Sequence, residues 1–275
     1  MGTILLKLKT KVERPLDASV ISPDVFAGKS LKEIESLELW RGNKKIKLGE
    51  VFDVSGESGQ KPEEITIKIE GDLSKARRIG KQMTSGKIIV NGNAGFYVGD
   101  SMKGGEIHVH GNVDSWLGFE MKGGNIEVDG DAGDFIGSAY RGSKNGMSGG
   151  TIIVKGNAGS EIGCFMKDGL IRIGGDVGLY AGIHMQGGTI LVYGNSPGRL
   201  GAEMTGGKVI VMGKVPDVLP SFIIDEVRPN IKVGADKITG PFYSFSGDMT
   251  EGGNGKIFIS VPNNEHFKKK EAYIL

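Results

Sequence analysis

This sequence of 275 residues has little of several things that define common protein classes. It holds one cysteine, Cys164, which excludes an internal disulfide and a zinc or iron–sulfur site built from cysteines. Its 34 basic and 33 acidic side chains give a net charge of +1, so no overall charge marks a nucleic-acid binder or a membrane-surface protein. No apolar run approaches the roughly 18 residues of a membrane helix, and lysines interrupt the apolar N-terminal run, unlike in a signal peptide. We therefore expect a cytoplasmic protein with neither nucleic-acid nor membrane partners.

Glycine, in contrast, is abundant. There are 47 glycines but only 9 prolines, and no Gly-X-Y period, which excludes a collagen. The hydrophobic fraction of 38% is enough for a core and excludes a disordered tail. Thirty-three of the glycines lie between residues 83 and 213, so the glycine is concentrated in one region and a fixed period is worth testing.

Methionines mark that period. Their successive spacings are 19, 19, 26, 19, 19 and 19 residues, and the seven extra residues of the long unit are best placed within 139–146. Each unit reads approximately M-x-x-G-x-[IV]-x-[IV]-x-G-[ND]-[AV]-G-x-x-[VIL]-G-x-x. The marking residues are Met83, Met102, Met121, Met147, Met166, Met185 and Met204.

A unit of this kind holds short strands and tight turns. The alternating apolar residues are typical of a strand, the Gly-Asn or Gly-Asp pair is typical of a turn, and no segment is long enough for a helix of about ten residues. The predicted fold is all-β: a right-handed parallel β-helix, or solenoid, of about seven to eight 19-residue coils. We expect an N-terminal cap over 1–61, the β-helix over 62–214 and a C-terminal capping and docking segment over 215–275.

Stacked units place equivalent residues in ladders, and we expect the methionines to fill a third, buried column beside two aliphatic ladders. The first ladder is Ile88, Ile107, Ile126, Ile152, Ile171, Ile190 and Val209. The second is Val90, Val109, Val128, Val154, Ile173, Val192 and Val211.

Two groups of side chains could carry chemistry. His108 and His110 point the same way from one predicted strand, and Glu127 and Asp129 are the next residues in their ladders, which makes a metal site chemically reasonable. A solvated polar face is the interpretation that we favour for these four residues. A second group, Cys164 with His184 and Glu203, has the composition of a nucleophilic site, but a buried, inert cysteine is the favoured interpretation. We therefore assign no catalytic, cofactor-binding or metal residue to this chain.

Apolar residues at outward positions are a further signal, because a solvated face would be polar. They indicate a surface that is covered either by the C-terminal segment or by a partner. The aromatic ladder could alternatively stack sugars, so a carbohydrate-binding solenoid stays open. The candidates are Tyr97, Trp116, Phe135 and Tyr180 at one equivalent position, and Ile153, Leu191, Tyr193, Ile210 and Met212 beside the core ladders.

The 13-residue core G-x-x-M-x-x-G-x-I-x-V-x-G resembles the repeat of the C subunit of archaeal formylmethanofuran dehydrogenase. It is seen at 99–111, 118–130, 163–175, 182–194 and 201–213, with Ile173 at the valine position of the third segment and Val209 at the isoleucine position of the last, while Lys144 replaces the leading glycine of the fourth unit. The resemblance covers the whole chain in layout. More distantly, the repeat is similar to the glycine-repeat C-terminal domain of glutamate synthase.

The resemblance implies a non-catalytic scaffold subunit of an oxidoreductase complex. In that family the complex is ferredoxin-linked; it reduces CO2 and attaches it to methanofuran as a formyl group, the first step of methanogenesis from CO2. The implied partners are a metal–pterin subunit, an amidohydrolase-like subunit and iron–sulfur subunits. They would hold the tungsten or molybdenum pterin, the [4Fe-4S] clusters and a binuclear metal site, so no cofactor is expected in this chain. The alternative is a structural domain like that of glutamate synthase.

Overall fold

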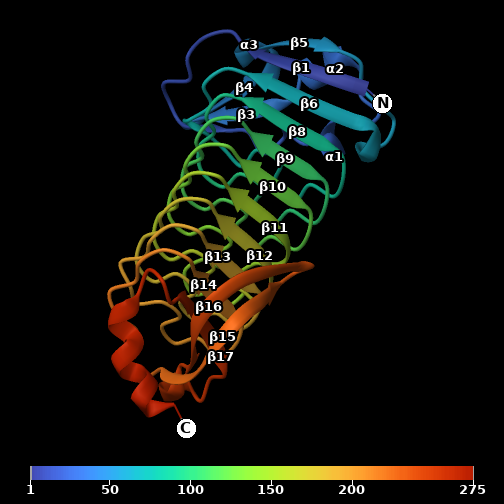
Figure 1. Ribbon diagram of the computed structural model, residues 1–275. Helices are drawn as coiled ribbons and strands as arrows, with labels where there is room; N and C mark the ends of the chain where they lie inside the picture. The colour runs from blue at the N-terminus through green and yellow to red at the C-terminus, as the bar shows by residue number, and fades with distance from the viewer. Residues whose placement is uncertain (1, 275) are drawn as a thin grey trace.

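The computed structural model of the chain describes residues 2–274. Its main feature is a 13-stranded sheet in the order β15-β16-β17-β14-β13-β12-β11-β10-β9-β8-β6-β1-β5. Figure 1 shows these strands one above another along an elongated molecule, with the two ends of the chain at opposite ends. A smaller sheet, β4-β3-β2-β7, belongs to the N-terminal part.

The N-terminal part joins both sheets. Its helices are α1 (Pro23–Phe26), α2 (Leu31–Glu35) and α3 (Leu48–Val51), followed by a 3-10 turn at Pro62–Glu64. Its strands are β1 (Gly2–Leu8), β2 (Leu16–Asp17), β3 (Glu38–Arg41), β4 (Lys44–Lys47), β5 (Phe52–Gly56), β6 (Ile65–Glu70) and β7 (Ala76–Arg77). A capping box opens α2: the Ser30 N–H donates to Glu33 Oε2 at 2.8 Å, and the Glu33 N–H donates to Ser30 Oγ.

The middle of the molecule is a run of parallel strands, which we call the parallel stack: β6 and β8 to β14. The strands that follow β7 are β8 (Lys87–Asn91), β9 (Glu106–Val109), β10 (Asn125–Val128), β11 (Ser148–Val154), β12 (Asp168–Ile173), β13 (Thr189–Val192) and β14 (Lys208–Val211). Each pairs in parallel with the next, so equivalent residues of successive units lie side by side.

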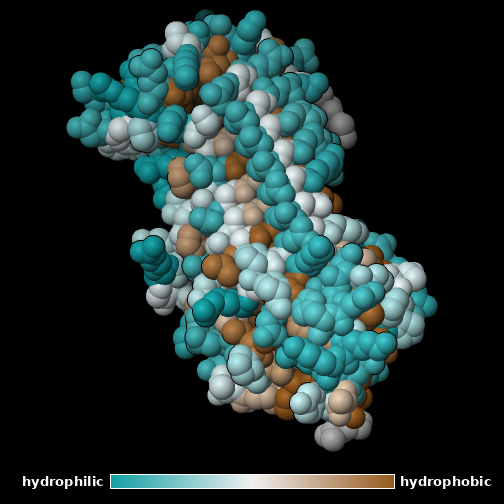
Figure 2. All heavy atoms as spheres, turned by 60° about the vertical axis from the view of Figure 1, so that its left-hand side comes forward, coloured by the Kyte–Doolittle hydropathy of each residue, from teal (hydrophilic) through white to brown (hydrophobic). Residues whose placement is uncertain are grey.

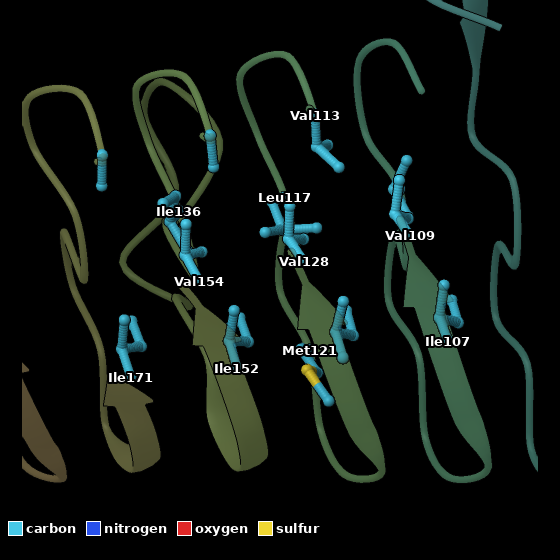
Figure 3. Close-up of a cluster of buried hydrophobic side chains, with 14 of the residues drawn as sticks. Ile107, Val109, Val113, Leu117, Met121, Val128, Ile136, Ile152, Val154 and Ile171 are labelled. Carbon is cyan, nitrogen blue, oxygen red and sulfur yellow. The ribbon is translucent and has the colours of Figure 1, made fainter. Parts of the chain in front are cut away.

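Both predicted aliphatic ladders are confirmed. Ile88 pairs with Ile107, which pairs with Ile126, and the register continues in this way to Val209. All members of the two ladders are buried. Figure 3 shows their side chains pointing to the same side of successive strands. The core therefore runs along the molecule as one continuous hydrophobic cluster.

The seven methionines of the period are also fully buried, as predicted, and they explain a glycine that recurs three residues after each later methionine. A Cβ built on Gly105 would lie 2.6 Å from the Met83 methyl carbon and 2.8 Å from the Gly86 carbonyl oxygen. Gly105 also has a φ of +84°, which side chains disfavour. The equivalent glycine in each later unit meets the preceding methionine in the same way. These are Gly124, Gly150, Gly169, Gly188 and Gly207.

The turn after each strand is held by side-chain amides and carboxylates. Each Oδ1 in this row accepts the backbone N–H of the equivalent residue one unit later, at 2.6–2.9 Å, ending at Lys214. This is why Asn or Asp recurs after glycine: a short acceptor must reach the next turn. The residues are Asn93, Asn112, Asp131, Asn157, Asp176 and Asn195.

The C-terminal part folds back over the parallel stack. It contains β15 (Ile223–Val233), β16 (Asp236–Gly247), β17 (Gly255–Ser260) and 3-10 stretches at Met249–Glu251 and Glu265–Tyr273. β17 extends the stack in parallel beyond β14, and β16 pairs antiparallel with both β17 and β15. Figure 1 shows the β15–β16 hairpin crossing over the lower strands of the stack.

The prediction of an all-β, right-handed parallel β-helix is wrong. The 13-stranded sheet is mixed, because β5 pairs antiparallel with β1 at one end and β15, β16 and β17 pair antiparallel at the other. A second sheet and three short helices add to it. The 19-residue period describes only residues 83–213. All the antiparallel pairs and the helices are formed by residues before and after this segment, although β6 and β17, which also lie outside it, join the parallel strands.

Among residues 2–274, none of the helices has the length and apolar character needed to span a membrane.

Candidate functional site

Three stacked rings form the most distinctive surface feature, which we call the aromatic column: Tyr97, Trp116 and Phe135. The Tyr97 and Trp116 ring centroids are 5.6 Å apart, and those of Trp116 and Phe135 are 4.4 Å apart, with the rings nearly parallel in both pairs. All three side chains are half-buried. Phe119 packs edge-on against Tyr97 and Trp116, which broadens the column. Its stacked arrangement leaves the ring edges, more than the ring faces, available for contact.

The column stands at a left-handed turn. Tyr97, Trp116 and Phe135 have φ values of 61°, 68° and 63°, a conformation that is unfavourable for bulky residues by about 1–2 kcal/mol each. Each backbone N–H there donates to a carbonyl of the next unit, at 2.8–3.2 Å, which holds the turn. The turn also explains the adjacent apolar residues in the sequence, because the next residue in each unit is fully buried while the ring points outward.

The fourth aromatic candidate does not join the column. Glu161 occupies the equivalent position after Phe135, with the same left-handed φ, and separates Tyr180 from the other rings. Tyr180 instead lies under the Arg199 guanidinium, 5.5 Å from its ring centroid. At the other end of the column, the Arg78 guanidinium lies 5.3 Å from the Tyr97 ring centroid. A cation therefore borders the aromatic positions at each end of the row.

The extra residues of the long unit form a loop beside the column. The Ala139 N–H donates to the Cys164 carbonyl and the Gly146 N–H donates to the Phe165 carbonyl, so the loop leaves and re-enters at neighbouring points. Tyr140 on this loop is 59% exposed.

Figure 2 shows one face of the molecule, where hydrophobic residues lie in separate groups among hydrophilic ones.

A cavity of about 300 Å³ lies between the loop and the column. Its wall includes Trp116 and Phe135, together with loop residues and the pair Cys164 and His184. The remaining lining residues are Ala139, Tyr140, Arg141, Gly142, Glu161, Phe165 and Ile183. Sequence reasoning missed the contribution of Phe119 and Tyr140, since no aromatic residue repeats at the position of Phe119 and Tyr140 lies in the extra loop.

The cysteine in that wall is not activated. Burial, assisted by the negative charge of Glu161, raises the pKa of Cys164 to about 12. The His184 ring stacks on Phe165 at 4.4 Å, and its Nδ1 lies 3.4 Å from Glu203 Oε2. His184 and Glu203 therefore lie next to each other, while no hydrogen bond joins Cys164 to His184 within residues 2–274. This arrangement favours the interpretation of Cys164 as an inert, partly buried side chain.

Both histidines of the predicted polar face contact one carboxylate. His108 Nε2 lies 3.1 Å from Asp129 Oδ1, and His110 Nδ1 lies 2.6 Å from Asp129 Oδ2. Lys155, which sequence reasoning missed, adds a contact of 2.7 Å to Asp129 Oδ1. The Lys155 ammonium and the two imidazoles hold the pKa of the Asp129 carboxyl well below its usual range.

Glu127, the fourth candidate, forms an ion pair with Lys155. Its Oε1 lies 2.7 Å from Lys155 Nζ, and the two carboxylates together hold the pKa of the Lys155 ammonium above its usual range, the Asp129 contact being the stronger. The signal for Lys155 was in the sequence: it follows Asp129 by 26 residues, which is the spacing of the long unit. Of the four predicted residues, three come together.

The other outward apolar candidates differ in how deeply they are buried. Leu191 and Ile210 were expected to be candidates for docking a partner, but they are fully buried beneath Ile231, Val233 and Phe242 of the β15–β16 hairpin. The docking expectation is wrong for these two residues, and the alternative holds for them, because the chain's own C-terminal hairpin covers them. Met212 packs at the edge of the same cluster, Ile153 is half-buried and Tyr193 is 47% exposed.

No family model matches this sequence. Several relatives match it over nearly the full length of both chains, and two of them are described here. One is the C subunit of the tungsten-containing formylmethanofuran dehydrogenase 2 of Methanothermobacter thermautotrophicus, 59% identical over 269 residues, 98% of this chain and 100% of the relative. The other is the subunit of the same description from Methanococcus maripaludis, 58% identical over 97% of this chain and 99% of the relative. For a third, from Methanothermobacter wolfeii, the match is confined to 98 residues, 36% of each chain, at 50% identity.

A solved structure is also similar. A chain of the formyltransferase/hydrolase complex of Methylorubrum extorquens, determined with methylofuran, superimposes with a TM-score of 0.81. The match covers 93% of this chain and 99% of that chain, at 26% identity. The structural relative is thus a chain of an enzyme complex, and the full-length sequence relatives are subunits of an oxidoreductase. From its identity to these relatives over its whole length, the chain belongs to the family of the formylmethanofuran dehydrogenase C subunits.

Proposed function

We propose that this chain is a non-catalytic scaffold subunit of a formylmethanofuran dehydrogenase complex of the tungsten-containing type. The complex would reduce CO2 and attach it to methanofuran as a formyl group, the first step of methanogenesis from CO2. The observation that carries the proposal is the 59% identity over 98% of the chain to a C subunit of that description. Both full-length relatives described above are subunits of tungsten-containing enzymes.

The residues of this chain do not fit the cofactors of such an enzyme. A [4Fe-4S] cluster is held by about four thiolates, and the sequence holds Cys164 alone. That cysteine has a raised pKa, which opposes metal ligation and nucleophilic chemistry alike. The metal–pterin, the iron–sulfur clusters and the binuclear metal site are therefore assigned to partners: a metal–pterin subunit, an amidohydrolase-like subunit and iron–sulfur subunits.

The docking face that we propose is the aromatic column with the loop beside it. Protein interfaces are enriched in aromatic and arginine side chains, and Trp116, Tyr140 and Arg141 lie around one cavity there. Sugar stacking, the alternative use of the column, needs open ring faces, whereas these rings stack on one another at 4.4 and 5.6 Å. The geometry therefore favours a protein partner over a carbohydrate.

A native affinity purification of the tagged full-length chain tests the proposal. Mass spectrometry of the co-purified proteins should identify the metal–pterin and iron–sulfur subunits, and elemental analysis should find tungsten in the purified complex. Recovery of glutamate synthase components instead, or of the chain without partners, would contradict the proposal.

Substitutions then locate the docking face. Tyr140→Glu and Trp116→Glu should reduce the co-purified subunits about tenfold or more, because aromatic residues at interface centres contribute most of the binding energy. Trp40→Glu is the matched control, since Trp40 is 47% exposed on β3, outside the column and loop. Equal losses in Trp40→Glu and Tyr140→Glu would place docking elsewhere. Thermal unfolding of each variant separates lost docking from lost folding.

A further inference from the structure

The cluster of His108, His110 and Asp129 has no place in the function proposed above. One ligand atom from each residue, an imidazole nitrogen or a carboxylate oxygen, lies within 4.8 Å of the other two. Two imidazoles and one carboxylate, with an open fourth position, form a ligand set that zinc commonly takes. A metal site at this cluster would be independent of the scaffold role and of any partner.

We propose that His108, His110 and Asp129 bind one divalent transition-metal ion of the zinc class. Three protein ligands leave a fourth position for water or for a ligand from elsewhere. The ligand types select imidazole-binding ions, namely zinc, cobalt, nickel and copper, over magnesium and calcium, which prefer sites made entirely of oxygen.

The backbone holds the ligands in place before any metal binds. His108 lies on β9 opposite Glu127 of β10, and the Asp129 N–H donates to the Val109 carbonyl at 2.9 Å. The His110 N–H donates to the Val90 carbonyl at 3.0 Å, so His110 is also tied to the strand on its other side. The two imidazole centroids are 4.1 Å apart. Because His108 lies on β9 and His110 and Asp129 directly follow β9 and β10, little ordering is needed on binding.

The site is open to ions from solvent. The side chains of His108, His110 and Asp129 are 26%, 45% and 29% exposed. On binding, each ring nitrogen directs its lone pair at the ion, and the hydrogen that it shares with Asp129 leaves to solvent or moves to the other nitrogen of the ring. The bonds formed are two nitrogen–metal bonds and one oxygen–metal bond, and no electrons are transferred.

Substitution of Lys155 should strengthen metal binding, whereas substitution of the ligands should weaken it, so the proposal can be tested by changes in both directions. The Lys155 ammonium lies 2.7 Å from Asp129 Oδ1 and 2.7 Å from Glu127 Oε1, so it occupies a carboxylate oxygen that the metal would use. A metal ion must therefore compete with this resident cation. Removal of the ammonium should tighten metal binding, and it also frees Glu127 to supply the fourth ligand.

The test titrates the full-length chain with Co²⁺, followed by the visible absorption that tetrahedral cobalt shows, and with Zn²⁺ against a chromophoric chelator. We expect one equivalent of metal to bind. Lys155→Met should lower the dissociation constant about tenfold, a difference of about 1.4 kcal/mol. His110→Ala and Asp129→Asn should each raise it at least tenfold or abolish binding. His184→Ala is the matched control, because His184 also pairs with a carboxylate of the next unit, Glu203.

Three results would overturn the proposal. The first is the absence of one-to-one binding in both the wild-type chain and Lys155→Met. The second is binding that survives His110→Ala and Asp129→Asn unchanged. The third is weaker binding in Lys155→Met, which would mean that the lysine does not compete for the site. Circular dichroism of each variant establishes that the chain is folded, and these exposed positions are expected to tolerate the substitutions.

Discussion

At the scale of single residues, the contact between a methionine and the glycine of the next unit explains why glycine is so abundant. The Met83 methyl carbon fills the space that a side chain on Gly105 would need, and the backbone of Gly105 turns there with φ of +84°. Two separate requirements, space and conformation, thus fall on one residue. The same pair recurs in each unit, so the glycines reflect close packing in a rigid structure.

Substitution at Gly105 should separate the two requirements. We expect Gly105→Ala to lower the free energy of unfolding by about 2–4 kcal/mol, from the left-handed φ together with the overlap with Met83 and with the Gly86 carbonyl oxygen. Gly142→Ala is the matched control, since Gly142 has φ of +85° but nothing within 4 Å of its added Cβ. The control should cost only about 1 kcal/mol. Chemical denaturation measures both, and equal losses would show that the close contacts at Gly105 are unimportant.

The reactivity of Cys164 is a second residue-scale prediction. Its pKa of about 12 lies above the ordinary value for a thiol, so the thiol stays protonated through pH 8–9 and ionises only as the pH nears 12. Iodoacetamide at pH 8 should therefore react roughly 10- to 100-fold more slowly with the native chain than with the urea-unfolded chain. Rapid alkylation of the native chain would instead support the interpretation of Cys164 as a nucleophile beside His184 and Glu203.

At the scale of elements, the C-terminal hairpin decides which outward residues are core. On β13 and β14, Leu191 and Ile210 point away from the main core and into a second one, which the β15–β16 hairpin closes with Phe242 and its neighbours. On β11 the equivalent outward residue, Ile153, remains half-buried. Equivalent positions in the sequence thus have different burial, because one segment far along the chain reaches only part of the parallel stack.

A pair of truncations measures that difference. Leu191→Ala should lower the free energy of unfolding by about 2–4 kcal/mol, because it leaves a cavity between two layers. Ile153→Ala should cost about 1 kcal/mol, since water can reach the truncated side chain. Unfolding in denaturant compares the two variants. Losses of equal size would mean that the hairpin does not seal the second core.

At the scale of the whole molecule, one continuous core runs from β1 to β17, and both ends of the stack are closed by antiparallel strands. These strands cover the ends of the parallel stack, while the edges of the whole sheet are β5 and the 11-residue β15, each paired on one side only. With this continuous core, the molecule is a rigid, elongated body whose lateral surfaces stay at fixed relative positions. This property supports the scaffold role, and the Trp116 and Tyr140 variants test where on the body partners dock.

Much of the fold and part of the site follow from spacing alone. The residues of both aliphatic ladders, the buried methionines, and the meeting of His108, His110 and Asp129 all depend on one unit lying in register on the next. The mixed sheet could not be predicted, since the segments outside 83–213 lack a period. Lys155 was missed because the extra loop shifts the count between its unit and that of Asp129.

The sequence by itself determined which residues face the core of the parallel stack, since neighbouring units pair locally and a fixed period brings like residues together. The tertiary structure alone decided the antiparallel ends, the burial of Leu191 and Ile210 under the hairpin, and the left-handed turn that carries the aromatic column. The physical reason is the range of the contacts. The period of the sequence specifies the contacts between adjacent units. The packing of a distant segment depends instead on the shape and exposed apolar area of the folded stack.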